Sequence, residues 1–141
     1  MSEQGYAGEI GSAEAFERMK ADPNAVLIDV RTGAEWNLVG HPDLASLDKQ
    51  PFFIEWQSLP DMARNDGFVE QVAAAGVPKD AIVLVLCRSG ARSRHAAIAL
   101  TGEGYAGCWN ISDGFEGPLD DAGHRGTVSG WRCNGLPWRQ G

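Results

Sequence analysis

The chain has 141 residues, 43% hydrophobic and 22% charged, a composition that fits one folded domain and excludes a disordered or collagen-like chain. Its 12 lysines and arginines against 19 aspartates and glutamates give a formal net charge of −7, which argues against nucleic acid or a membrane surface as a partner. No apolar run approaches the roughly 20 residues of a membrane-spanning helix, and the first residues lack the pattern of a signal peptide. We therefore expect a single domain over residues 1–141, with its core over about 6–138.

The first part of the chain predicts a helix, a strand and a helical turn. Ser12 is expected to cap a helix over 13–20, and the β-branched apolar run 26–30 is typical of a buried strand. Thr32 and Glu35 have the spacing of a capping box, which predicts that a further helical turn begins there.

The rest of the chain alternates between loops, strands and helices. Residues 81–86 form the most apolar run, which predicts a central parallel strand covered on both faces. The other expected elements are a loop over 40–49, strands over 52–56 and 108–111, helices over 66–75 and 94–103, and an irregular tail over 114–141. Strands alternating with helices predict an α/β fold with a mostly parallel central sheet and helices on both faces.

The cysteines indicate the cellular compartment. There are three, at positions 87, 108 and 133, and an odd number without a secretory signal predicts reduced thiols in the cytoplasm. No two cysteines have C-x-x-C spacing, and the three histidines are scattered. We therefore expect neither a metal site nor a cofactor.

The segment that carries chemistry joins the most apolar strand to a helix, and it reads Cys87-Arg88-Ser89-Gly90-Ala91-Arg92-Ser93. Ligands of open parallel sheets bind beyond the carboxyl ends of the strands, which is where Cys87 is expected. The unpaired N–H groups and dipole of the following helix attract an anion and favour a thiolate, and Gly90 allows a sharp backbone bend. The arginines of this loop, with Arg94, add positive charge. The pattern predicts a nucleophilic thiolate in an anion cradle, whereas Cys108 and Cys133 are expected to be inert.

This loop resembles the C-x-x-G-x-R-S active-site loop of the rhodanese family of sulfurtransferases. Further resemblances follow the order of the family, namely Asp29-Val30-Arg31 with Glu35-Trp36, Gly40-His41-Pro42, Trp109-Asn110-Ile111 with Gly114, and Gly135-Leu136-Pro137. The match extends from about Tyr6 to Trp138. The chain is therefore identified as similar to a single rhodanese-like domain.

The resemblance implies that Cys87 takes a sulfane sulfur from a donor such as thiosulfate and carries it as a persulfide. A thiol or cyanide would then remove that sulfur, and the backbone N–H groups of residues 88–93 would hold the persulfide. The expected partners are a small anionic sulfur donor and a protein that carries a thiol or a persulfide. The sequence leaves open whether the protein is a small-molecule enzyme or a relay between proteins.

The side chains around the cysteine have separate expected roles. Arg88 is expected to contact the sulfonate of the donor, whereas Arg92 is expected to organise the loop by pairing with a carboxylate or with backbone carbonyls. Glu35 and Asp29 are the candidate partners of Arg92. The supporting residues are Asp29, Arg31 and Glu35, and the hydroxyl donors are Ser89 and Ser93. Trp36, Trp131 and Trp138 are candidates for the pocket wall, His95 is expected on the helix surface, and Glu55 and Asp113 are expected to be solvated charges.

Two other functions remain as alternatives. Cys-loop phosphatases and arsenate reductases use C-x₅-R, whereas the spacing from Cys87 to Arg92 is C-x₄-R. The shorter loop is better sized for a sulfur atom than for a phosphoryl group. A non-catalytic interaction module is the second alternative, and the intact cysteine loop argues against it.

Overall fold

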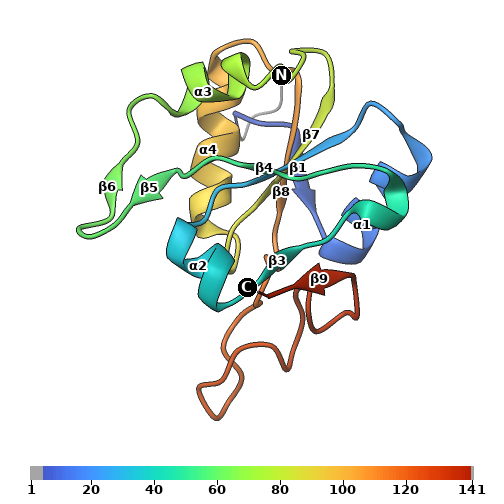
Figure 1. Cartoon of the computed structure of the whole chain (residues 1–141), viewed down its shortest axis with the longest axis vertical. Coiled ribbons are helices and arrows are strands. Elements are labelled where there is room, and N and C mark those ends of the chain that lie inside the picture. The colour runs from blue at the N-terminus through green and yellow to red at the C-terminus, as the bar shows by residue number, and fades with distance from the viewer. Residues whose placement is uncertain (1–4, 141) are drawn as a thin grey trace.

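The computed structural model describes residues 5–140, and its centre is a five-stranded parallel sheet with the strand order β1-β8-β7-β2-β4 (Figure 1). The strands are β1 (Gly8–Ile10), β2 (Val26–Asp29), β4 (Phe52–Phe53), β7 (Ile82–Leu86) and β8 (Gly107–Ile111). The apolar run predicted as a central strand is β7, the middle strand of the sheet.

Helices cover both faces of this sheet. The α3 (Phe68–Ala74) and α4 (Ala91–Gly102) helices pack on one face, and α1 (Ser12–Ala21) packs on the other, each with its own apolar core. Residues 83–86 of β7 are completely buried between the two layers. Burying each of these four aliphatic side chains contributes about 1.5–3 kcal/mol, which explains why the strand is apolar throughout. The predicted α/β fold, with helices on both faces of a parallel sheet, is confirmed.

The short helix α2 (Gly33–Leu38) begins at the predicted capping box. The Thr32 hydroxyl accepts a bond from the Glu35 N–H at 3.3 Å, and the Glu35 carboxylate accepts one from the Thr32 N–H at 3.2 Å. Two backbone donors at the helix start are thereby satisfied by side chains within one turn.

Ser12 does not cap α1, contrary to the prediction. The N-cap is Gly11, and both the N–H and the hydroxyl of Ser12 donate to the Asp113 carboxylate, at 2.9 and 2.8 Å. Asp113 also accepts a bond from the Gly130 N–H at 3.1 Å. It is therefore not the solvated charge that the sequence predicted, because it joins the start of α1 to the carboxy-terminal tail.

Several short elements lie where the sequence predicted a loop, an irregular tail or no element. Strand β3 (His41–Pro42) pairs antiparallel with β9 (Trp138–Arg139), which ties the tail to the first half of the chain. A hairpin of β5 (Gln57–Ser58) and β6 (Ala63–Arg64) follows β4, and a 3₁₀ turn spans Ala45–Leu47. The strand predicted over 52–56 is limited to the two residues of β4. These pairings depend on partners far along the chain or on a turn without an apolar alternation, so local patterns did not predict them.

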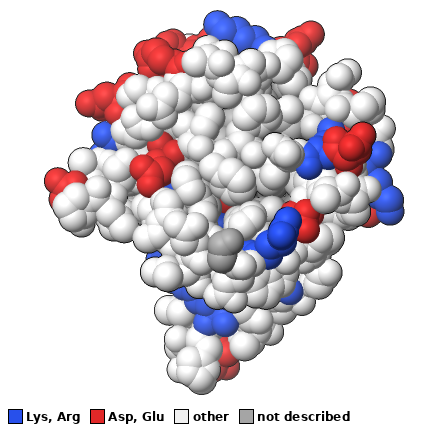
Figure 2. Space-filling view, viewed as in Figure 1, with Lys and Arg blue, Asp and Glu red and all other residues white. Residues whose placement is uncertain are grey.

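The surface fits the acidic composition. On the face drawn in Figure 2, basic side chains lie in small groups beside acidic ones, so this face carries no extended basic surface. Within residues 5–140, no helix has the length and apolar character needed to cross a membrane.

Candidate active site

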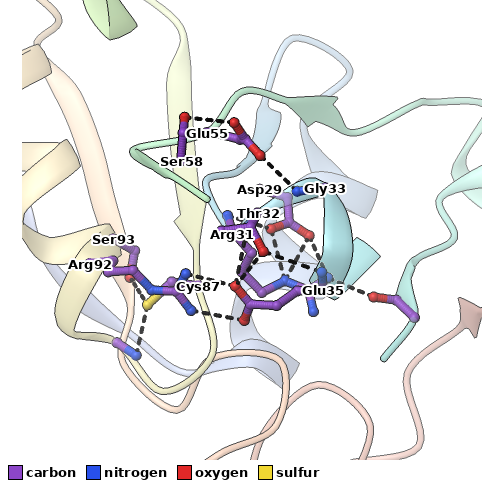
Figure 3. Close-up of polar contacts among 12 residues, drawn as sticks. Asp29, Arg31, Thr32, Gly33, Glu35, Glu55, Ser58, Cys87, Arg92 and Ser93 are labelled. Carbon is purple, nitrogen blue, oxygen red and sulfur yellow. Dashed lines mark hydrogen bonds and ion pairs between the residues drawn. The ribbon is translucent and has the colours of Figure 1, made fainter. Parts of the chain in front are cut away.

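Cys87 is the first residue after β7, and its side chain is 1% exposed. Its sulfur accepts hydrogen bonds from the Gly90 N–H at 3.1 Å and from the Ser93 hydroxyl at 3.2 Å (Figure 3). Gly90 is the N-cap of α4 and supplies no capping side chain, so the first N–H groups of this helix lack a side-chain cap. The sulfur therefore lies at a helix start whose donors favour an anion.

The helix begins at Ala91, three residues before the predicted start, because Gly90 turns the chain. Gly90 has φ +107°, a left-handed conformation that glycine adopts without strain. A Cβ at this position would lie 2.5 Å from the Ser112 carbonyl oxygen. The loop after β7 can therefore approach the end of β8 only with glycine at position 90.

A second glycine closes the other side of the loop. Gly114 has φ +66°, and a Cβ there would lie 2.4 Å from the Arg88 carbonyl oxygen. The next residue, Phe115, donates its N–H to the Cys87 carbonyl at 2.8 Å. The backbone around the cysteine is thus held by the turn that follows β8.

Arg92 forms a two-pronged ion pair with Glu35, with N–O distances of 2.7 and 2.9 Å (Figure 3). Burial raises the pKa of Glu35, but the bonds from Arg92 outweigh it and hold that pKa below its ordinary value. Burial likewise lowers the pKa of Arg92, and the same bonds raise it overall. Both groups stay charged, and the pair links the first turn of α4 to the capping box of α2.

Asp29 is not the partner of Arg92, because it pairs with Arg31. The two side chains are fully buried, and their closest N–O distance is 2.8 Å. Arg31 also donates to the Gly40 carbonyl at 2.8 Å, and its guanidinium lies 4.2 Å from the centre of the Phe115 ring. This pair therefore links the end of β2 to Gly40 and to Phe115, the residue whose N–H bonds the Cys87 carbonyl.

The cysteine opens into a cavity of about 300 Å³. Its walls come from the cysteine loop and from the β5–β6 hairpin, and the lining residues are Cys87, Arg88, Ser89, Ala91, Arg92, Gln57 and Met62. The three tryptophans expected in the wall do not line it, so that prediction is wrong. Trp131, for example, is fully buried in the core against Phe16. The hairpin was not predicted as a strand pair, so its two lining residues had no recognisable signal.

Two further side chains differ from, or add to, the prediction. Glu55 is not a solvated charge, since it accepts bonds from the Gly33 N–H and the Ser58 hydroxyl, both at 2.8 Å, and so joins α2 to the hairpin. Asn110 lies in β8, is 2% exposed, and accepts a bond from the Ser93 hydroxyl. A polar asparagine inside an otherwise apolar strand was the feature of the sequence that could have pointed to this residue.

His95 is exposed on α4, as predicted.

Among residues 5–140, no three His, Cys, Asp or Glu side chains are grouped so that they could hold a metal ion. The groups that the structure brings together at this site are the Cys87 thiol, the donors of the loop and the side chains of Arg88 and Arg92.

Comparison with known proteins assigns the family. The family model described as the STR4 middle domain matches residues 7–141. The chain belongs to this family. This chain resembles the crystal structure of Rv0390 from M. tuberculosis with a TM-score of 0.88 and 47% identity, over 96% of this chain and 99% of that one.

Other relatives, some of them distant, connect this chain with the rhodanese fold. An uncharacterized protein of Rickettsia conorii is 42% identical over 92% of this chain and 95% of its own length. A protein named sulfurtransferase from Allochromatium vinosum is 27% identical over 92% of each. The rhodanese-like domain of an Anabaena protein has a TM-score of 0.63 and 14% identity, over 94% of this chain and 78% of that one. The fold is rhodanese-like, and distant relatives of the chain are sulfurtransferases.

Proposed function

We propose that this protein is a sulfurtransferase that carries a sulfane sulfur as a persulfide on Cys87. The observation that supports it most is the surroundings of the sulfur, which lies at the end of β7 with the Gly90 N–H at 3.1 Å and the Ser93 hydroxyl at 3.2 Å. These donors stabilise negative charge on sulfur, both when it attacks and when it leaves.

The reaction needs two displacements at sulfur. The Cys87 thiolate attacks the outer sulfur of thiosulfate, the S–S bond of the donor breaks, and sulfite leaves with the electron pair. The negative charge then lies on the outer sulfur of the persulfide. Cyanide or a thiolate attacks that sulfur in the second step, and the bond between the two sulfurs breaks to return the thiolate of Cys87. Atoms and charge balance in both steps without a metal or an external oxidant.

The charges of the cavity fit a small anionic donor. Arg88 and Arg92 both line the cavity, but Arg92 directs both terminal nitrogens of its guanidinium to Glu35. Arg88 is exposed, so its guanidinium is the group proposed to meet the sulfonate of the donor. A thiol- or persulfide-carrying protein would deliver or receive sulfur at the same opening.

The pairing of Arg92 also argues against phosphate chemistry. A Cys-loop phosphatase needs its loop arginine to hold two oxygens of the phosphoryl group. Here both terminal nitrogens of the Arg92 guanidinium bond Glu35, with N–O distances of 2.7 and 2.9 Å. Sulfur transfer is therefore the better fit to the cavity.

The test is to incubate the protein with thiosulfate and measure its intact mass. We expect a gain of one sulfur atom, with peptide mapping to Cys87 and loss of the added sulfur on treatment with cyanide. The variants Cys108→Ala and Cys133→Ala serve as matched controls and should load sulfur normally. A correctly folded protein that gains no sulfur from thiosulfate or polysulfide would favour the non-catalytic module instead, and sulfur on another cysteine would refute the role of Cys87.

A further inference from the structure

A chain of polar side chains leads from the cysteine, at the end of the central strand β7, to the edge strand β1. The Ser93 hydroxyl lies 3.2 Å from the Cys87 sulfur and also bonds the Asn110 side-chain oxygen. The amide nitrogen of Asn110 donates to the Gly90 carbonyl at 3.0 Å and to the Glu9 carboxylate at 2.9 Å. Ser93 and Asn110 are 0% and 2% exposed, so bulk water does not reach the bond between them, whereas Glu9 at the outer end is exposed.

The orientation of Asn110 is determined by its neighbours. Its two N–H groups have acceptors in Gly90 and Glu9, so its oxygen must face Ser93. Glu9 lies directly opposite Asn110 in the pairing of β1 with β8, and the Tyr6 hydroxyl donates to the carboxylate of Glu9. The edge strand β1 therefore supplies the group that fixes the amide.

Ser93 has two acceptors and only one hydroxyl proton. If the proton is directed to Asn110, the serine oxygen offers the sulfur of Cys87 no donor; if it is directed to the sulfur, the Asn110 oxygen loses its bond. We infer that Asn110 is a positioning residue whose oxygen competes with the sulfur for this proton. No such role follows from the loop motif, since Asn110 and Glu9 lie outside it.

The competition acts differently on the two halves of the reaction, and it rests on the sulfur-carrying role proposed for Cys87. In the persulfide the negative charge is on the outer sulfur, so the proton of Ser93 is free to bond Asn110. When the outer sulfur is transferred to an acceptor, charge returns to the inner sulfur, and the proton must turn towards it. Ser93 therefore assists sulfur release, and Asn110 restrains that assistance.

Glu9 strengthens the restraint. A carboxylate that accepts a bond from an amide polarises it, and the amide oxygen becomes a better acceptor. Replacing Glu9 by glutamine removes the negative charge and weakens the hold of Asn110 on the serine proton. The proton then turns more readily to the sulfur, and release becomes faster.

The experiment measures the two half-reactions separately in the full chain, following the persulfide by intact mass. Thiosulfate gives the rate of uptake, and cyanide added to the loaded, desalted protein gives the rate of release. We expect Ser93→Ala to slow release about tenfold relative to uptake, the size expected for one hydrogen bond to a charged group. Glu9→Gln should change this ratio in the opposite direction, by about two- to fivefold. Glu70→Gln, which removes an exposed charge on α3, should leave both rates unchanged.

The double variant Glu9→Gln with Ser93→Ala separates the relay from a through-space effect of charge. If Glu9 acts through the serine proton, Glu9→Gln has no further effect once the hydroxyl is gone. An undiminished effect in the double variant, or an effect of Glu9→Gln in the same direction as that of Ser93→Ala, would overturn the inference. If Ser93→Ala does not fold, failure of Glu9→Gln to exceed Glu70→Gln overturns it. Absence of sulfur on the unmodified protein refutes the proposed function itself, and with it this role of Asn110.

Discussion

Cys87 and Cys108 lie on neighbouring parts of one sheet and are almost equally buried, at 1% and 0% exposure, yet their surroundings differ. Cys87 follows the end of β7, where a backbone N–H and a hydroxyl bond its sulfur. Cys108 lies within β8 opposite Val83, and burial among apolar side chains raises the pKa of its thiol to about 11. Equal burial therefore leaves the two sulfurs in different surroundings, because two hydrogen-bond donors contact the sulfur of Cys87 whereas apolar side chains surround that of Cys108.

The largest expected effect comes from replacing each of the two cysteines in turn and comparing the rates of sulfur transfer. Cys87→Ser should lower the rate of sulfur transfer at least about a thousandfold, because a serine hydroxyl does not form the persulfide on which turnover depends. Cys108→Ala should retain the rate. Steady-state formation of thiocyanate from thiosulfate and cyanide measures both. Equal loss of activity in the two variants would mean that the position of Cys87 has no special role.

The second prediction concerns the reactivity of Cys108. With a pKa of about 11, only about one in a thousand of its thiols is ionised at pH 8. Iodoacetamide at this pH should therefore modify the exposed Cys133 at least about a hundredfold faster than Cys108 in the folded protein. Peptide mapping over time measures both rates. Labelling of Cys108 at the rate of Cys133 would show that the core around β8 opens to solvent.

The third prediction removes the ion pair that holds the loop of Cys87. Arg92→Ala should lower the free energy of unfolding by about 2–3 kcal/mol, because the largely buried Glu35 carboxylate loses both hydrogen bonds from the guanidinium. It should also lower kcat. Lys20→Ala is the matched control, since Lys20 forms a long, exposed pair with Glu17 and its loss should cost less than about 0.5 kcal/mol. Urea unfolding measures the stabilities, and equal values for the two variants would contradict the role of Arg92.

The fourth prediction concerns the charge at the cavity. Arg88→Ala should raise KM for thiosulfate about tenfold with little change in kcat, because an exposed guanidinium contributes binding of the anion rather than chemistry. Stability should stay within about 0.5 kcal/mol of the unmodified protein. The opposite pattern, a loss of kcat at constant KM, would assign Arg88 to the reacting sulfur.

The smallest effect is the pH dependence of the Arg92–Glu35 pair. Because the pKa of Glu35 is lower in the folded protein than its ordinary value, ionised Glu35 stabilises the fold above that ordinary value. This contribution is lost as the pH falls through the lowered pKa. The stability difference between the unmodified protein and Glu35→Gln, about 1 kcal/mol at pH 7, should therefore shrink towards pH 3. A difference that stays constant over this range would contradict the assignment.

The loop around Cys87 and the elements beside it are largely predictable because they are built from local interactions. The capping box of Thr32 and Glu35 spans one helical turn, and the apolar run of β7 directly precedes Cys87. A glycine three residues after the cysteine was sufficient to predict the sharp bend that the structure has at Gly90. A carboxylate was one of the two kinds of partner expected for Arg92, the other being backbone carbonyls, and two candidate carboxylates remained.

The choice between those carboxylates depends on tertiary contacts, and so do the other polar pairs that hold the segments around the cysteine loop. Asp29 is taken by Arg31 two residues away, which leaves Glu35 to Arg92 at a separation of 57 residues. Ser12 bonds Asp113, and Asn110 bonds Glu9, each pair separated by 101 residues. Local periodicity carries no information on such pairs, because they form only when the strands of the sheet assemble. The sequence by itself determined the class of fold and the position of the cysteine loop after the central strand, since each depends on neighbouring residues. Only the tertiary structure decided which buried polar groups hold that loop, because a buried donor or acceptor must find its partner wherever the fold brings one within reach.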